Sequence, residues 1–169
     1  MPLCKYLHQD IVAFGGEHDG VACEQCGIIK QIVIDDGCVA RVIPETKRKD
    51  YIDSKGSVHP NCFSHDNRCK PKISVLLVNE HFENSLNLFR RITGITDLYG
   101  VAELEVKQIK AYCPLLEIIK DDYAYSGNSV LDFPNHCSLM SFSGKNMKEL
   151  NNEFKYKTIL AKAAVLKEC

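Results

Sequence analysis

The chain has 169 residues, of which 45% are hydrophobic and 25% charged, and its formal net charge is −1. Because these proportions are those of an average soluble globular protein, they exclude a wholly disordered or collagen-like chain. The longest apolar stretches, such as 73–78, have the length of a strand, so no membrane partner is expected. The N-terminal residues lack the apolar core of a signal peptide, and we therefore expect an intracellular protein whose thiols stay reduced.

Nine cysteines and six histidines are the most informative side chains in the sequence. An odd number of cysteines in a reducing compartment argues against a complete disulfide framework, whereas zinc is the usual intracellular partner of clustered Cys and His. The first cluster consists of Cys4-x3-His8 and, after fourteen intervening residues, Cys23-x2-Cys26-Gly27. A C-x2-C pair in a tight turn places two thiolates on one side, and a second pair across a short hairpin closes a tetrahedral site. This spacing predicts a zinc ribbon.

Strands are expected around this first cluster. Residues 11–21 are typical of a strand, a Gly-rich turn and a return strand. The β-rich run 28–34 ends at the turn signal 35–37, and residues 38–43 return as a third strand. Two metal knuckles joined by a small antiparallel sheet would make residues 1–43 an all-β zinc ribbon.

The N-terminal segment resembles a known transcription module. The stretch Asp19-Gly-Val-Ala-Cys23-Glu-Gln-Cys26-Gly, the aliphatic pair after it and Ile34-Asp-Asp-Gly37 make residues 4–43 similar to the N-terminal zinc ribbon of the TFIIB family of general transcription factors. The resemblance implies docking onto an RNA polymerase and zinc bound by Cys4, His8, Cys23 and Cys26. The first pair is spaced x3 instead of the family's x2, and the usual Trp-Arg after the ribbon is missing, so His18 and Cys38 are alternatives for the fourth ligand. The stretch also resembles the start of a baculoviral IAP repeat, but that family's Trp and His-x6-Cys pair are absent.

A second cluster lies within eleven residues of loop composition: His59, Cys62, His65 and Cys69. Two His with two Cys fit a tetrahedral zinc ion, although the chelate loops between them are very short. We therefore treat these four residues as a candidate second metal site. The alternatives are a polar linker with incidental Cys and His, and a partial site that Cys38 or a partner chain completes.

Positive charge is concentrated in the middle of the sequence. Residues 41–72 carry eight Lys or Arg against four acidic residues, and they include Lys47-Arg48-Lys49. A basic linker over residues 44–72 is a candidate for contact with nucleic-acid phosphates, with Lys47, Arg48 and Lys49 as the binding residues. The alternative is a linker that is only solvated.

Residues 73–169 are expected to form a mainly helical domain. Apolar residues at helical spacing predict helices over about 78–93, over about 98–112, and from residue 143 or 146 to about 167. A short helix or strand is expected at 115–119, and residues 123–143 are expected to be mostly loop. Three isolated cysteines are expected to be buried or terminal thiols, namely Cys113, Cys137 and Cys169.

The predicted fold class is thus a small all-β zinc ribbon followed by a mainly α-helical domain, α+β overall. This order is similar to that of the TFIIB family, whose ribbon and linker precede cyclin-like helical repeats, with room here for one repeat. It is also similar to viral late transcription factors that combine a zinc ribbon with a helical C-terminal part.

The functional expectation is a zinc-binding transcription initiation factor that contacts RNA polymerase and DNA in the nucleus or at a viral replication site. The sequence contains none of the common phosphate-loop, dinucleotide, zinc-protease or nucleophile-elbow motifs, so no enzyme is expected. One alternative is a zinc-stabilised viral accessory or structural module that binds another protein. A second alternative is a small zinc-dependent hydrolase or nuclease that uses the cluster at residues 59–69.

Overall fold

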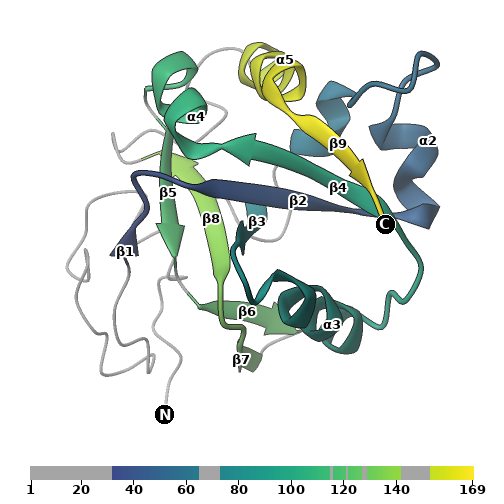
Figure 1. The fold of residues 1–169 in the computed structure, drawn as a ribbon, viewed down its shortest axis with the longest axis vertical. Helices are drawn as coiled ribbons and strands as arrows, with labels where there is room; N and C mark the ends of the chain where they lie inside the picture. Colours follow the sequence, from purple (N-terminus) through teal and green to yellow (C-terminus); the bar gives the residue numbers. More distant parts are fainter. Residues whose placement is uncertain (1–31, 65–72, 115, 121, 127–128, 142–152) are drawn as a thin grey trace.

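The computed structural model describes residues 32–64, 73–114, 116–120, 122–126, 129–141 and 153–169. Its centre is a seven-stranded antiparallel sheet with the strand order β1-β5-β8-β3-β2-β4-β9 (Figure 1). A separate two-stranded hairpin is formed by β6 and β7. The strands are β1 (Ile32–Val33), β2 (Cys38–Pro44), β3 (Ile73–Val78), β4 (Leu98–Glu105), β5 (Leu116–Lys120), β6 (Tyr123–Ser126), β7 (Ser129–Asp132), β8 (His136–Ser141) and β9 (Val165–Glu168).

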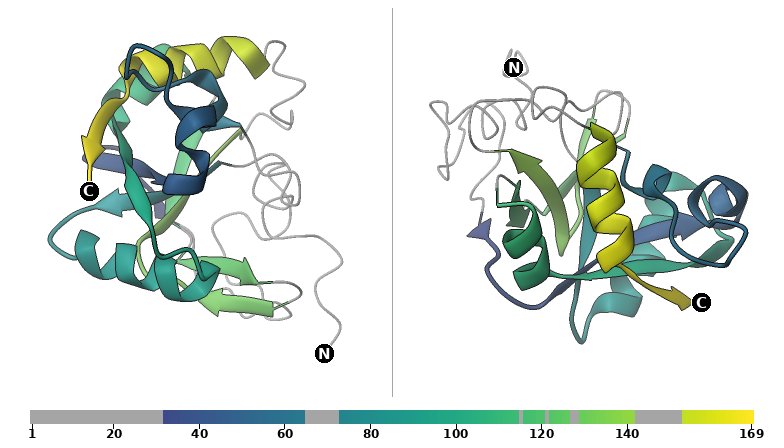
Figure 2. Two further views of the ribbon diagram at one scale, coloured as in Figure 1. Left: turned by 90° about the vertical axis from the view of Figure 1, so that its right-hand side faces the viewer. Right: turned by 90° about the horizontal axis from the view of Figure 1, so that it is seen from above.

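Helices cover both faces of the sheet and make the fold three layers deep. Figure 2 shows α2, α4 and α5 on one face, with α3 and the β6–β7 hairpin on the other. Within the described residues, none of the helices has the length and apolar character needed to cross a lipid bilayer. The helical segments are η1 (Glu45–Lys47), α2 (Arg48–Tyr51), η2 (Pro60–Phe63), α3 (Phe82–Thr93), α4 (Val106–Tyr112) and α5 (Glu153–Ala163).

Two hydrophobic cores lie between the sheet and its covering layers. The α3-side core is the smaller one and consists of Ala40, Val42, Leu76, Leu86, Val101 and Phe133. The α5-side core is larger and includes Val39, Ile43, Cys62, Phe63, Ile73, Ala102, Leu104, Ile109, Leu116, Ile118, Leu139 and Leu160.

The interior strand β2 shows how the sheet is buried on both faces. Val39 and Ile43 point into the α5-side core, whereas Ala40 and Val42 point into the α3-side core. A strand that is covered on both faces has an almost continuous apolar sequence instead of an alternating one. The polar exception is Arg41, whose Nε and Nη1 donate to the carbonyl oxygens of Cys62 (3.1 Å) and Ser74 (2.9 Å).

Helix α3 confirms the helix predicted near residues 78–93, although it begins at Phe82 because Val78 still belongs to β3. Leu86 is buried, and Phe89 and Ile92 on the same stripe pack against the α3-side core. The helix ends at Gly94, which adopts a left-handed conformation with φ 73° and donates its N–H to the Arg90 carbonyl.

The predicted fold class, a small all-β zinc ribbon followed by a mainly α-helical domain, is wrong. Residues 38–43, expected as the ribbon's third strand, form most of β2 and lie inside the large sheet between β3 and β4. The preceding strand β1 also belongs to this sheet, because Ile32 pairs with Lys120 of β5. Most of the segment expected to be the ribbon, residues 1–31, lies outside the described residues.

The expected basic linker also differs from what the structure shows. Pro44 ends β2, and residues 45–63 contain η1, α2 and η2, which pack on the sheet instead of connecting two separate units. Val58, Cys62 and Phe63 from this segment are buried in the α5-side core. The remaining residues of the expected linker, 65–72, lie outside the described part of the chain.

Residues 98–112, predicted as one helix, form a strand followed by a helix. β4 occupies the first eight of these residues and α4 the last seven. The prediction rested on Val101 and Leu104, which are three residues apart as on one face of a helix. In a strand these two side chains lie on opposite faces, and here Val101 enters the α3-side core while Leu104 enters the α5-side core. Both faces of β4 are covered, so its apolar side chains do not alternate with polar ones. Their spacing along the sequence therefore does not distinguish this strand from a helix.

The C-terminal part contains more strand than expected. The segment 123–143, expected to be mostly loop, contains β6, β7 and β8. Of the segment 115–119, predicted as a short helix or strand, residues 116–119 belong to the strand β5. The helix expected to reach about residue 167 ends at Ala163, and Val165, expected on its buried stripe, lies on β9 and is 59% exposed. The thiol predictions are confirmed: Cys113 and Cys137 are buried and Cys169 is an exposed free thiol.

Candidate functional site

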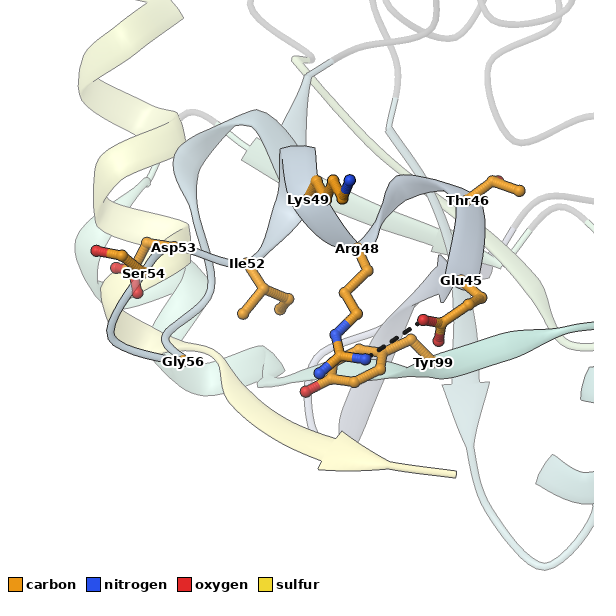
Figure 3. A pocket seen from close by; sticks show the side chains of 9 residues that line it. All are labelled: Glu45, Thr46, Arg48, Lys49, Ile52, Asp53, Ser54, Gly56 and Tyr99. Carbon is orange, nitrogen blue, oxygen red and sulfur yellow. Dashed lines mark hydrogen bonds and ion pairs between the residues drawn. The ribbon is translucent and has the colours of Figure 1, made fainter.

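A pocket of about 700 Å³ opens beside the first helical segments after β2 (Figure 3). We call it the polar pocket, because most of its lining side chains are charged or carry a hydroxyl group. Its walls come from η1, α2, the turn after α2, and β4, which is far away in sequence. The lining residues are Glu45, Thr46, Arg48, Lys49, Ile52, Asp53, Ser54, Gly56 and Tyr99.

The turn after α2 forms one wall, and Asp53 holds its shape. The Oδ1 atom of Asp53 accepts hydrogen bonds from the backbone N–H groups of Lys55 (2.8 Å) and Ser57 (2.9 Å). The bond from Ser57 is the main cause that lowers the pKa of Asp53 below its usual value. Gly56 has φ 80°, a conformation that side-chain-bearing residues rarely adopt, so the turn depends on glycine here.

Arg48 and Tyr99 form the opposite wall and contact each other. The guanidinium carbon of Arg48 lies 4.3 Å from the centre of the Tyr99 ring, within the range of a cation–π contact. Arg48 Nη1 also lies 3.4 Å from Glu45 Oε1. The Tyr99 hydroxyl donates to Glu168 Oε1 of β9 at 2.7 Å, which raises the pKa of Tyr99 and keeps the phenol neutral. The Arg48 guanidinium therefore has contacts with the neighbouring η1 and with the distant β4, whose Tyr99 is in turn bonded to β9.

The charge around the polar pocket is nearly balanced. Residues 44–63 contain four basic and three acidic side chains. The basic Arg41 is turned inward onto backbone carbonyls, and three more basic residues of the expected linker lie outside the described residues. Within the described residues, the segment around Lys47, Arg48 and Lys49 therefore carries almost as many negative as positive charges.

The structure places the three predicted nucleic-acid-binding residues on consecutive helical turns. Lys47 ends η1, and Arg48 and Lys49 begin α2. All three are exposed. Arg48 and Lys49 line the polar pocket, and within the described residues only Arg48 of the three is ion-paired.

The predicted zinc ligands are mostly beyond the described part of the chain. Cys4, His8, His18, Cys23 and Cys26 lie in residues 1–31, and His65 and Cys69 lie in residues 65–72. Of the remaining candidates, Cys38 begins β2, and burial together with the charge of Glu103 raises its pKa. Within the described ranges, no group of three or more His, Cys, Asp or Glu side chains is arranged to hold a metal ion.

The two described members of the second cluster have structural roles. His59 caps η2, where its Nδ1 accepts a hydrogen bond from the Asn61 N–H at 3.1 Å. Cys62 is completely buried in the α5-side core, and this burial raises its pKa to about 12. In the described structure Cys62 therefore packs as a small apolar side chain of the α5-side core.

The sequence reasoning missed most of the polar pocket. The run from Asp53 to Gly56 carries a clear turn signal that locates one wall. Tyr99 carries no such signal, because only the pairing of β2 with β4 brings it to Arg48. In addition, the sequence pattern predicts a helix over about 98–112, the segment that contains Tyr99.

Comparison with known proteins gives no further guide to this site. No protein-family model matches the chain, and no curated protein or solved structure matches it either. An activity therefore has to be argued from the chemistry of the site and the residue pattern.

Proposed function

We propose that the protein is a zinc-stabilised transcription initiation factor that contacts nucleic acid through the segment Lys47–Lys49. The observation that supports nucleic-acid contact is the exposure of these three consecutive cations, of which Arg48 and Lys49 line the polar pocket. Lys47 and Lys49 have no ion pair within the described residues, so each is available to a phosphate oxygen.

The zinc and polymerase parts of the proposal rest on the sequence of residues 4–26. The C-x2-C-Gly knuckle and the preceding Cys/His pair are typical of a structural zinc site, which has no open coordination position and serves stability. The similarity to the TFIIB ribbon makes RNA polymerase the protein partner and DNA the nucleic acid. We propose the zinc ligands Cys4, His8, Cys23 and Cys26 on this basis.

Zinc analysis of the purified protein tests the metal part. We expect one or two equivalents per chain, and we expect Cys23→Ser to lose one equivalent because a tetrahedral site with three ligands binds zinc far more weakly. Cys169→Ser is the matched control, since Cys169 is an exposed free thiol on the sheet's edge. A wild-type protein without zinc, purified from zinc-supplemented medium, would contradict this part of the proposal.

A salt series of DNA binding tests the nucleic-acid part. Replacing Lys47 and Lys49 together by glutamine is expected to weaken binding and to reduce the slope of log K against log salt by about 2, since each phosphate contact contributes roughly 0.9. The matched control replaces Lys107 and Lys162, two exposed lysines on α4 and α5, and is expected to leave the slope unchanged. Equal effects of the two double variants would mean that Lys47 and Lys49 are not specific contacts.

A protein-interaction module is the second candidate, and β9 is the observation that favours it. This strand lies at the end of the sheet order, and within the described residues it pairs only with β4. Val165 is 59% exposed on it. An open strand edge is a common template for binding an extended segment of a partner. Capture of RNA polymerase subunits by a protein that binds no DNA would favour this candidate.

A further inference from the structure

We propose that the polar pocket holds one unpaired base of a single-stranded nucleic acid, stacked on the Arg48 guanidinium, with a neighbouring phosphate beside Lys49. This inference rests on the proposed nucleic-acid contact and specifies its form.

The Arg48–Tyr99 pair supplies the stacking surface. The guanidinium carbon of Arg48 lies over the Tyr99 ring, 4.3 Å from its centre, and the Arg48 side chain remains 53% exposed. A guanidinium that is stacked on one side offers a second flat face, and bases of single-stranded nucleic acids stack on such faces. Because Glu45 and the Tyr99–Glu168 hydrogen bond already hold this pair in place, little conformational entropy is lost when a base binds.

The size and lining of the pocket suit a flat polar group. Its volume of about 700 Å³ lies within the usual range for sites that enclose small organic ligands. In Figure 3 the side chains of Ile52 and Arg48 extend from the α2 side toward Tyr99, while Ser54 and Gly56 close the other side. Ile52 offers an apolar contact to the base, and the hydroxyl of Ser54 offers a hydrogen-bonding group.

The balance of charge favours a single strand over a duplex. Duplex binding without base contacts depends on many phosphate contacts, but residues 44–63 carry only one basic side chain more than acidic ones. Stacking of one base contributes about 1–3 kcal/mol and does not depend on a large positive surface. A concave pocket also requires a base that has left the helical stack, which is readily available only in a single strand.

The test compares Arg48→Lys with the wild type by fluorescence anisotropy, using an oligo(dT) of about twelve nucleotides and a duplex of about the same length. Lysine keeps the charge but removes the flat surface, so we expect a loss of about 5- to 150-fold for oligo(dT) and little change for the duplex. Arg91→Lys is the matched control, because Arg91 is exposed on α3 at the other face of the sheet.

Two further measurements separate stacking from misfolding. Ser54→Leu fills part of the pocket from an exposed position without changing charge, and it is expected to weaken oligo(dT) binding in the same way. The emission of 2-aminopurine placed in the oligonucleotide should change on binding to the wild type and not on binding to Arg48→Lys. Circular dichroism melting curves of both variants are expected to match that of the wild type.

The outcomes distinguish this inference from the proposed function. A wild type that binds only duplex, or an Arg48→Lys variant that binds oligo(dT) as Arg91→Lys does, overturns the base pocket but leaves nucleic-acid binding intact. An equal loss for single strand and duplex in Arg48→Lys also overturns it, because stacking of an unpaired base would affect only the single strand. A wild type that binds neither probe at low salt overturns both.

Discussion

Replacement of Phe63 by alanine is expected to lower the free energy of unfolding by about 3–5 kcal/mol, the usual cost of removing a large buried aromatic side chain. Phe63 lies on η2, is completely buried in the α5-side core, and belongs to a segment that contacts α5. Alanine at this position leaves a cavity that the surrounding strands and helix cannot fully close. Urea denaturation followed by circular dichroism measures the change.

Tyr112→Ala is the matched control for Phe63→Ala. Tyr112 is also aromatic and helical, but it is 61% exposed at the end of α4, so its replacement is expected to change the free energy of unfolding by about 0.5 kcal/mol or less. If Phe63→Ala costs no more than Tyr112→Ala, then residues 44–63 are a loosely attached linker as the sequence suggested, and their place in the core is wrong.

Gly100→Ala is expected to destabilise the edge of the sheet by about 1–3 kcal/mol, with the effect centred on β9. Gly100 pairs with Glu168, and a Cβ atom at position 100 would collide with the backbone carbonyl oxygen of Lys167. Backbone atoms cannot rotate away as a side chain does, so β9 must move away from β4. We expect faster amide hydrogen exchange at residues 166–168, measured by NMR, together with a lower urea midpoint.

The control for this variant is Glu105→Ala, which places alanine at an exposed position of the same strand. It is expected to leave exchange in β9 unchanged. Protection of residues 166–168 that is equal in Gly100→Ala and wild type would mean that β9 does not approach β4 as closely as the structure shows.

Part of the fold was predictable from the sequence because it depends on local signals. The stripe from Leu86 to Ile92 and the stop at Gly94 located α3. The β-rich run and the turn signal at 35–37 located the start of β2. In both cases the side chains that decide the structure are neighbours along the chain.

The remaining part depends on contacts between distant segments. Nothing within β4 shows that both of its faces are covered, so Val101 and Leu104 appeared to share one helix face. The same holds for the candidate site. Local charge identified Lys47–Lys49, but Tyr99 reaches Arg48 only through the pairing of β2 with β4, and Glu168 reaches Tyr99 only through β9.

The second cysteine cluster shows why motif spacing alone was insufficient there. Cys62 has the spacing of a metal ligand, but it sits beside Phe63, and η2 directs both side chains into the core. Cysteine is among the residues most often buried, so a thiol next to a large apolar residue is as consistent with packing as with coordination.

The strand order has a consequence for how the chain acquires its structure. β2 lies between β3 and β4, and Ile32 of β1 finds its partner Lys120 only after most of the chain has been made. Because each such pairing closes a long loop before it is stabilised, folding is expected to take milliseconds to seconds, as for other proteins dominated by distant strand pairs. During synthesis, the middle strand β3 lacks one of its two neighbours until β8 has emerged from the ribosome, and the β4 edge is covered only by β9.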